Sequence, residues 1–221
     1  MSSRTNAAGA QIPESTHIYA GRPIKETGGA VSSAPELEMH MGHGRIAALR
    51  ALERSIPLSI SIDVCTSVGG DMFSAMRALL AGSRYLVNIE ALEADRTVER
   101  LPITSLDVLH AATQGGATAA WLGGEVGSIT PGKRADVILV RTDTWGMQPL
   151  NYPAGAIVES GHPMLVDTVF VDGEVLKRDG RLVHHDFAHV RRLAEEARDR
   201  LMARAGIEHP GLWQPEVYEN K

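Results

Sequence analysis

The sequence contains a single cysteine, Cys65, among 221 residues, so the chain cannot form an internal disulfide. A lone thiol suits a reducing cytosol, and we expect a cytoplasmic protein. No uninterrupted apolar run approaches the roughly 20 residues that a membrane-spanning helix needs, which predicts no membrane partner. The formal net charge of −5 argues against a nucleic-acid partner, since such proteins present a basic face.

What is present fits a globular protein, with 43% hydrophobic and 22% charged residues. Residues 1–24 are polar, lack the apolar core of a signal peptide and are predicted to be a flexible leader. Beyond residue 24 the sequence changes character near Leu122, and this shift predicts two successive parts of different architecture.

The part at 25–121 reads as strands and helices in alternation, which is typical of a parallel α/β unit. Residues 58–63 alternate strictly, with Leu58, Ile60 and Ile62 on one strand face and Ser59, Ser61 and Asp63 on the other. A second strand is predicted at 29–33. Helical spacing of apolar residues predicts helices at 45–54, from Asp71 to about Gly82, and at 106–114 after a Ser105 cap, with a charged loop at 89–100.

The part at 122–185 predicts a small antiparallel sheet, with strands at 135–140, 168–171 and 174–177 and an irregular segment at 145–163. The dipeptides at 172–173 and 179–180 are both Asp-Gly, a strong hairpin signal because the turn needs positive φ. Residues 186–221 are predicted to be a helix and tail. In the helix, 187–205, the apolar side chains expected to face inward are Val190, Leu193, Ala197 and Leu201.

Asp63 is the strongest candidate for a catalytic residue, because it closes an apolar strand of the parallel type, where α/β barrels place their catalytic groups. The alternative is an ordinary aspartate that caps the next turn. His40 and His43 lie in a predicted loop at 39–44 and are candidate substrate contacts, or else solvent-facing histidines. Glu36 and Glu38 could offer a carboxylate pair, although solvated loop charges are the commoner case.

Several ordered segments resemble the amidohydrolase superfamily, in particular its cytosine deaminase and triazine chlorohydrolase branch. The segments at 26–36, 41–44 and 59–63 are similar to its last two barrel strands. Those at 127–140 and 169–175 are similar to the entry and closing hairpin of its small β-sandwich. The resemblance implies the C-terminal part of a (β/α)8 TIM-type barrel, then a β-sandwich segment and a C-terminal helix. It also implies that Asp63 is both a ligand of a divalent metal, zinc or iron, and a proton acceptor.

The sequence departs from this family in its histidines, which lie at 17, 40, 43, 110, 162, 184, 185, 189 and 209. The family's His-x-His metal ligands are therefore missing, and a full barrel needs about 250 residues. Three hypotheses follow. The chain is a hydrolase of non-peptide carbon–nitrogen bonds in a heterocyclic or amidine-like small molecule, a catalytically silent structural module, or half of a split enzyme. The expected partners are a small-molecule substrate and either further copies in a homo-oligomer or a complementary barrel chain.

Overall fold

The computed structural model describes residues 21–207 of the chain. By its contacts the chain divides into two compact units, Met1–Gly180 and Arg181–Lys221. Most of the predicted leader lies outside the described residues, and its end belongs to helix α1 (Gly21–Glu26). None of the helices among residues 21–207 is both long enough and apolar enough to cross a membrane.

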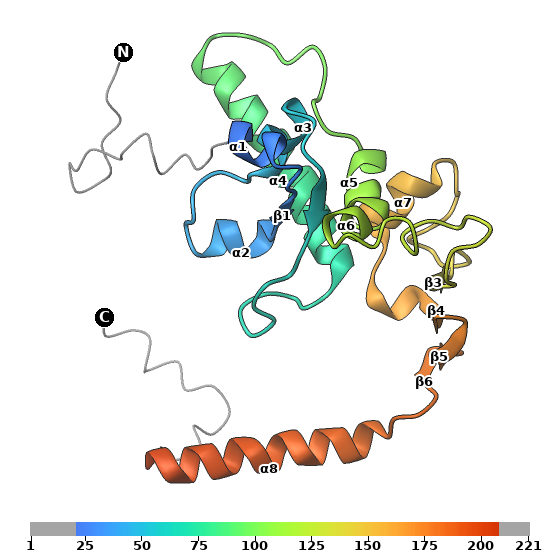
Figure 1. The fold of residues 1–221 in the computed structure, drawn as a ribbon. Helices are drawn as coiled ribbons and strands as arrows, with labels where there is room; N and C mark the ends of the chain where they lie inside the picture. The colour runs from blue at the N-terminus through green and yellow to red at the C-terminus, as the bar shows by residue number, and fades with distance from the viewer. Residues whose placement is uncertain (1–20, 208–221) are drawn as a thin grey trace. The chain divides into compact units, whose positions relative to one another are not determined.

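The first unit opens with two short parallel strands, β1 (Val31–Ser33) and β2 (Leu58–Ile60), paired from Val31 with Leu58 to Ser33 with Ile60. Helices α2 (Pro35–His40) and α3 (Ala48–Glu53) connect the strands, and α4 (Met72–Glu93) follows them (Figure 1). The predicted succession of a strand, a helix, a second strand and a second helix is confirmed by β1, α3, β2 and α4. The predicted strand at 58–63 is too long, because the backbone leaves the strand conformation after Ile60.

Two predictions around these helices are wrong for identifiable reasons. The segment after β1 forms α2 instead of a loop, because Pro35 starts the helix with φ already fixed and glutamates occupy its first turn. Helix α4 continues far beyond Gly82, so residues 89–93 are helical. Gly82 does not break the helix. It permits close packing, since a Cβ there would lie 2.5 Å from Ile46 Cδ1.

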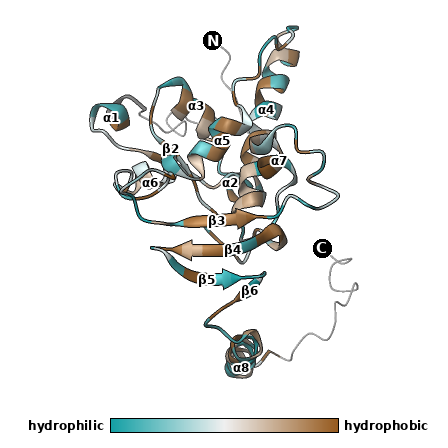
Figure 2. Ribbon diagram, turned by 90° about the vertical axis from the view of Figure 1, so that its right-hand side faces the viewer, coloured by the Kyte–Doolittle hydropathy of each residue, from teal (hydrophilic) through white to brown (hydrophobic). Residues whose placement is uncertain are grey.

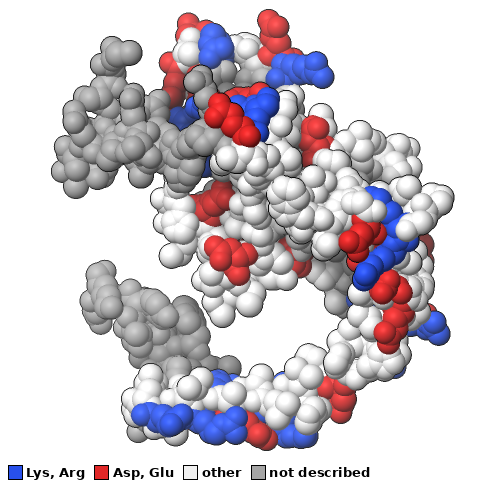
Figure 3. All heavy atoms as spheres, viewed as in Figure 1, with Lys and Arg blue, Asp and Glu red and all other residues white. Residues whose placement is uncertain are grey.

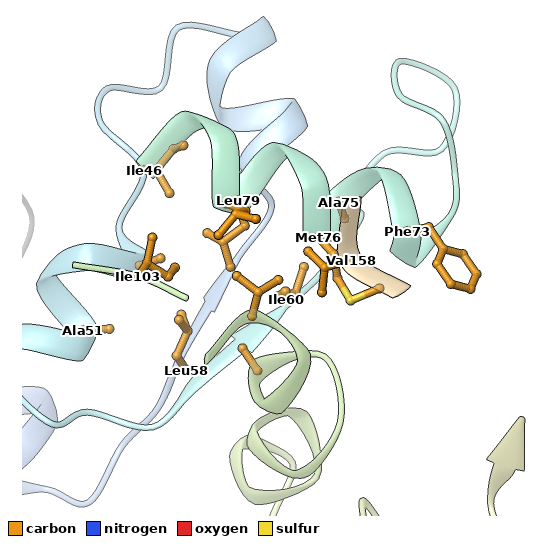
Figure 4. Close-up of a cluster of buried hydrophobic side chains, with 14 of the residues drawn as sticks. Ile46, Ala51, Leu58, Ile60, Phe73, Ala75, Met76, Leu79, Ile103 and Val158 are labelled. Atoms are coloured by element: carbon orange, nitrogen blue, oxygen red, sulfur yellow. The ribbon is translucent and has the colours of Figure 1, made fainter. Parts of the chain in front are cut away.

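The core of the first unit lies between β1–β2 and the helices α4, α5 (Ser105–Ala111) and α7 (Pro153–Ser160). Leu79, Ile103, Val108 and Val158 are fully buried, and Figure 4 shows Leu79, Ile103 and Val158 among the side chains of this cluster. Burial of one such side chain contributes about 1.5–3 kcal/mol. Helix α7 lies in the segment predicted to be irregular, where Pro153 begins a helix too short for a clear periodic pattern.

The predicted helix at 106–114 is two helices, α5 and α6 (Gln114–Ala119). The N-cap of α5 is Thr104 rather than the predicted Ser105. Thr104 and Asp107 form a reciprocal capping box, and the Ser105 side chain is buried instead. Lys133, in the segment between α6 and β3, contacts the start of α6 and the chain that follows it. Its Nζ donates to Gln114 Oε1 at 3.0 Å and to the Gly123 carbonyl oxygen at 2.6 Å.

Trp121 ends α6 in a conformation that bulky residues rarely adopt. Its φ is +62° and its side chain is 83% exposed. The N–H of Trp121 donates to the Thr118 carbonyl at 3.0 Å and that of Leu122 to the Ala117 carbonyl at 2.8 Å. This is a Schellman motif, in which glycine is the usual residue at the left-handed position.

Trp121→Gly is therefore expected to stabilise the protein by about 0.5–1 kcal/mol, because glycine removes the left-handed strain and the exposed indole has little packing to lose. Chemical denaturation gives the free energy of unfolding. Trp145→Gly is the control, since Trp145 is fully exposed and its φ is not positive. An equal gain in both variants would contradict the explanation by backbone strain.

The antiparallel strands predicted at 135–140, 168–171 and 174–177 are confirmed. Strands β3 (Val137–Val140), β4 (Val166–Val171) and β5 (Glu174–Arg178) lie side by side in that order (Figure 2). The β4–β5 hairpin turns at Asp172 and Gly173, with φ of +51° and +82°, as its Asp-Gly sequence predicts.

The second unit contains β6 (Arg181–Leu182) and helix α8 (Phe187–Ala205), whose ends match the sequence prediction. Asp186 caps α8 through the Ala188 N–H at 2.9 Å, and Gly206 ends it with φ of +64°. Charged side chains of both signs lie along this helix (Figure 3). The side chains predicted to face inward are not buried, and Val190 and Leu193 are 51% and 48% exposed.

Candidate functional site

Asp63 lies three residues beyond the carboxyl end of β2, at the edge where β1 also ends. The Ser61 N–H donates to the Ser33 carbonyl at 2.8 Å, which extends the pairing of the strands by one bond. Asp63 itself is exposed and has φ of +63°. Aspartate and asparagine tolerate this left-handed conformation better than most residues. The strand thus ends at Ile60, and the backbone that follows presents the Asp63 carboxylate to solvent.

The segment after Asp63 returns to the amino end of α4 through a short loop. The Ser67 N–H donates to the Val64 carbonyl at 3.1 Å, and Gly70 turns the chain with φ of +67°. Asp71 then caps α4, as the sequence predicts, by accepting from the Ser74 N–H at 2.9 Å and the Ser74 hydroxyl at 2.7 Å. The loop at 61–71, which carries Asp63, thus begins at the end of the paired strand β2 and ends at the capped start of helix α4.

The pKa of Asp71 depends on opposing effects. Burial alone would raise it, but hydrogen bonds from the Ser74 side chain and backbone, a further one from the Phe73 backbone and the nearby Arg77 charge together lower it. The native state therefore binds the proton less tightly than the unfolded chain, whose aspartate pKa is about 3.9. The resulting stabilisation is fully present above about pH 4 and is lost as the pH falls through the lowered native pKa.

Asp71→Ala is expected to lower the free energy of unfolding by about 1 kcal/mol at pH 7. The difference from the unmodified chain should shrink as the pH falls from about 4 through the lowered native pKa, because the unfolded chain binds the proton first. Denaturation series between pH 7 and the acid limit of the fold measure it. Asp71→Asn is the matched control, because its amide oxygen can cap the helix but does not titrate. If the loss of unfolding free energy in Asp71→Ala did not change with pH, the Asp71 carboxylate would not contribute to the pH dependence of stability.

The two candidate histidines occupy different local structures. His40 is the last residue of α2 rather than part of a loop, whereas His43 lies in the loop beyond it, and both are exposed. The His43 backbone N–H donates to the Glu38 carbonyl at 3.0 Å. Within residues 21–207 no hydrogen bond joins either imidazole to Asp63. Their role as substrate contacts remains a prediction.

Glu38 is more constrained than a solvated loop charge. Its Oε1 accepts from the Ser33 hydroxyl at 3.0 Å and from the Ala34 N–H at 2.9 Å. The Oε2 atoms of Glu36 and Glu38 are buried, and in the described part of the chain neither has a hydrogen-bond partner. The interpretation of these two residues as solvated charges is therefore wrong. A proline at N1 followed by acidic residues was the available signal for a helix here.

A metal site needs three or more protein ligands in most enzymes that use zinc. Among the described residues, no group of three or more histidine, cysteine, aspartate or glutamate side chains could hold a metal ion. Cys65 is exposed, two residues after Asp63, and is a free thiol. Asp63 alone does not make a metal site, so a metal bound at this carboxylate would need ligands from outside residues 21–207.

The sequence model of the amidohydrolase family matches residues 12–176 of the chain, which include both parallel strands, Asp63 and most of the antiparallel sheet. The chain belongs to the amidohydrolase family. It is 34% identical over 181 residues to a 5′-deoxyadenosine deaminase of Methanothermobacter thermautotrophicus. It is 29% identical over 180 residues to a 5-methylthioadenosine/S-adenosylhomocysteine deaminase of Acetivibrio thermocellus.

Both alignments cover 81% of this chain but only 38% and 39% of the two relatives. A zinc-bound adenosine deaminase from Xanthomonas campestris superposes with a TM-score of 0.72 at 28% identity, over 84% of this chain and 41% of the other. A zinc complex of the atrazine chlorohydrolase TrzN of Arthrobacter aurescens, at 21% identity and a TM-score of 0.65 over 81% of this chain and 38% of that one, shares the fold. The resemblance inferred from the sequence is confirmed, and the chain spans about two-fifths of the proteins it matches.

Proposed function

We propose that this chain contributes the C-terminal part of a hydrolase that cleaves a non-peptide carbon–nitrogen bond in an adenosine-type small molecule. The observation that carries the proposal is the exposed carboxylate of Asp63 at the carboxyl edge of two parallel strands, in a chain of the amidohydrolase family. In this proposal β1 and β2 are the last two strands of a (β/α)8 barrel, and β3 to β5 belong to a small β-sandwich. Deaminases among the relatives support the heterocyclic substrate class.

The role proposed for Asp63 is that of a general base. An ionised carboxylate at this edge can take a proton from the water that attacks the substrate carbon, and such proton transfer typically contributes 10²- to 10⁴-fold. His40 and His43 are the proposed substrate contacts. Zinc or iron is the cofactor that the family implies, but the described residues do not offer a complete ligand set, so no step is assigned to a metal.

Two rival functions are tested beside this proposal. One is a catalytically silent structural module, and the other is a split enzyme in which another polypeptide supplies further strands. In residues 21–207 β1 and β2 pair only with each other, although parallel sheets are normally extended and covered on both faces. Further strands are therefore expected, whether they come from the same protein or from another polypeptide.

Ammonia release from 5′-deoxyadenosine tests the proposal, with zinc added and the metal content of the purified chain measured in parallel. Hydrolysis by the chain alone, with about one bound metal per site, supports the proposed hydrolase. Hydrolysis that appears only when a complementary barrel polypeptide is added supports the split enzyme. Neither hydrolysis nor bound metal under either condition supports the silent module and refutes the proposal.

A further inference from the structure

Glu38 turns its side chain back from α2 onto the end of strand β1. Ser33, the last residue of that strand, has no exposed surface. The Ser33 hydroxyl and the Ala34 N–H both donate to Oε1 of Glu38, at 3.0 and 2.9 Å. Hydrogen bonds to an ionised acceptor are stronger than those between neutral groups, so this carboxylate fixes both the side chain and the backbone at the strand end.

The same strand end supports Asp63. The carbonyl oxygen of Ser33 accepts from the Ser61 N–H at 2.8 Å, and Ser61 precedes Asp63 by two residues. Ser61 is already outside β2, so this bond is the last one that ties the approach to Asp63 to the sheet. A path of hydrogen bonds therefore runs from Glu38 through Ser33 to Ser61, two residues before Asp63.

We propose that Glu38 is a positioning residue for Asp63. It holds the carboxyl end of β1 so that the Ser33 carbonyl keeps Ser61, and hence the left-handed turn at Asp63, in one conformation. Catalytic groups need such support, because a small displacement of a base from its reacting atom costs much of its effect. The catalytic meaning of this contact rests on the proposed function, whereas the contact itself does not.

The first test compares amide hydrogen exchange at Ser61 in the full 221-residue chain. Glu38→Ala is expected to speed exchange at Ser61 by roughly tenfold or more through local opening, while Leu79 in the core keeps its protection. Glu38→Gln should restore slow exchange, because its amide oxygen can accept both hydrogen bonds. Glu53→Ala is the control, since Glu53 is an exposed glutamate at the end of α3.

The second readout is the carboxyl ¹³C resonance of Asp63, which a merely structural role for Glu38 would leave in place. It is expected to shift in Glu38→Ala and to return in Glu38→Gln. Unchanged Ser61 exchange, an unchanged Asp63 resonance, or equal loss of protection at Leu79 would each overturn the proposal. In a preparation that hydrolyses 5′-deoxyadenosine, Glu38→Ala should lower kcat without changing KM. Absence of hydrolysis in the unmodified chain would count against the proposed function alone, because exchange and the resonance still decide the role of Glu38.

Discussion

Asp63→Asn is expected to lower kcat for ammonia release from 5′-deoxyadenosine by about 10²- to 10⁴-fold, in whichever preparation carries the activity. Asparagine keeps the size of the side chain and tolerates the φ of +63°, but it cannot accept a proton. The free energy of unfolding should therefore stay unchanged. Steady-state kinetics and denaturation of the same sample separate loss of chemistry from loss of structure.

Asp95 provides the matched control for this substitution. It is also exposed and left-handed, with φ of +51°, but it follows α4 at the other end of that helix from the Asp63 loop. Asp95→Asn should leave the rate unchanged. If Asp63→Asn hydrolysed the substrate at the full rate, Asp63 would have no role as a base and would be the turn-forming aspartate that the sequence also allowed.

Gly115→Ala is expected to destabilise the protein by about 1–3 kcal/mol, since overpacking against a fixed backbone forces whole elements apart. A Cβ at Gly115 would lie 2.3 Å from the Leu58 carbonyl oxygen in β2 and 3.0 Å from that of His110. Neither oxygen can move like the end of a flexible side chain. Helix α6 would have to leave the strand that leads to Asp63, and chemical denaturation would measure the loss.

The neighbouring glycine should respond in the opposite direction. A Cβ at Gly116 meets only the Ala111 carbonyl oxygen, at 3.6 Å, which is an ordinary contact. Gly116→Ala is therefore expected to stabilise α6 by about 0.4–1 kcal/mol, because alanine loses less conformational entropy on folding. If both alanine variants shifted the unfolding free energy in the same direction, helix propensity rather than the close approach to β2 would control this site.

The sequence predicted best where a single local rule decided the structure. The hairpin at Asp172–Gly173 follows from the positive φ that its turn needs, and the bounds of α8 follow from the helical spacing of its apolar residues. Asp63 stood out because it ended an alternating strand. These features depend on neighbouring residues alone, so they can be recognised without knowledge of the fold.

The errors arose where distant parts of the chain meet. Gly82 and Gly115 signal flexibility in a sequence, but each lies inside a helix at a point where Ile46, which precedes α3, or Leu58 of β2 packs closely against it. Glu38 looked like a solvated charge until the fold placed it against Ser33. Helix α7 is too short to show a pattern of its own, and its burial is set by packing with α4 and α5.

The sequence by itself determined the family, the order of the predicted strands and helices, and Asp63 as the candidate catalytic residue. These features can be recognised from residues that are neighbours along the chain. Only the tertiary structure decided where the strand stops, that Asp63 has a positive φ, and that Glu38 of α2 accepts a hydrogen bond from Ser33 at the end of the neighbouring strand. Those outcomes depend on hydrogen bonds between residues that the chain separates by up to 28 positions, from Ser33 to Ser61. Pairing at that distance is settled by the fold as a whole.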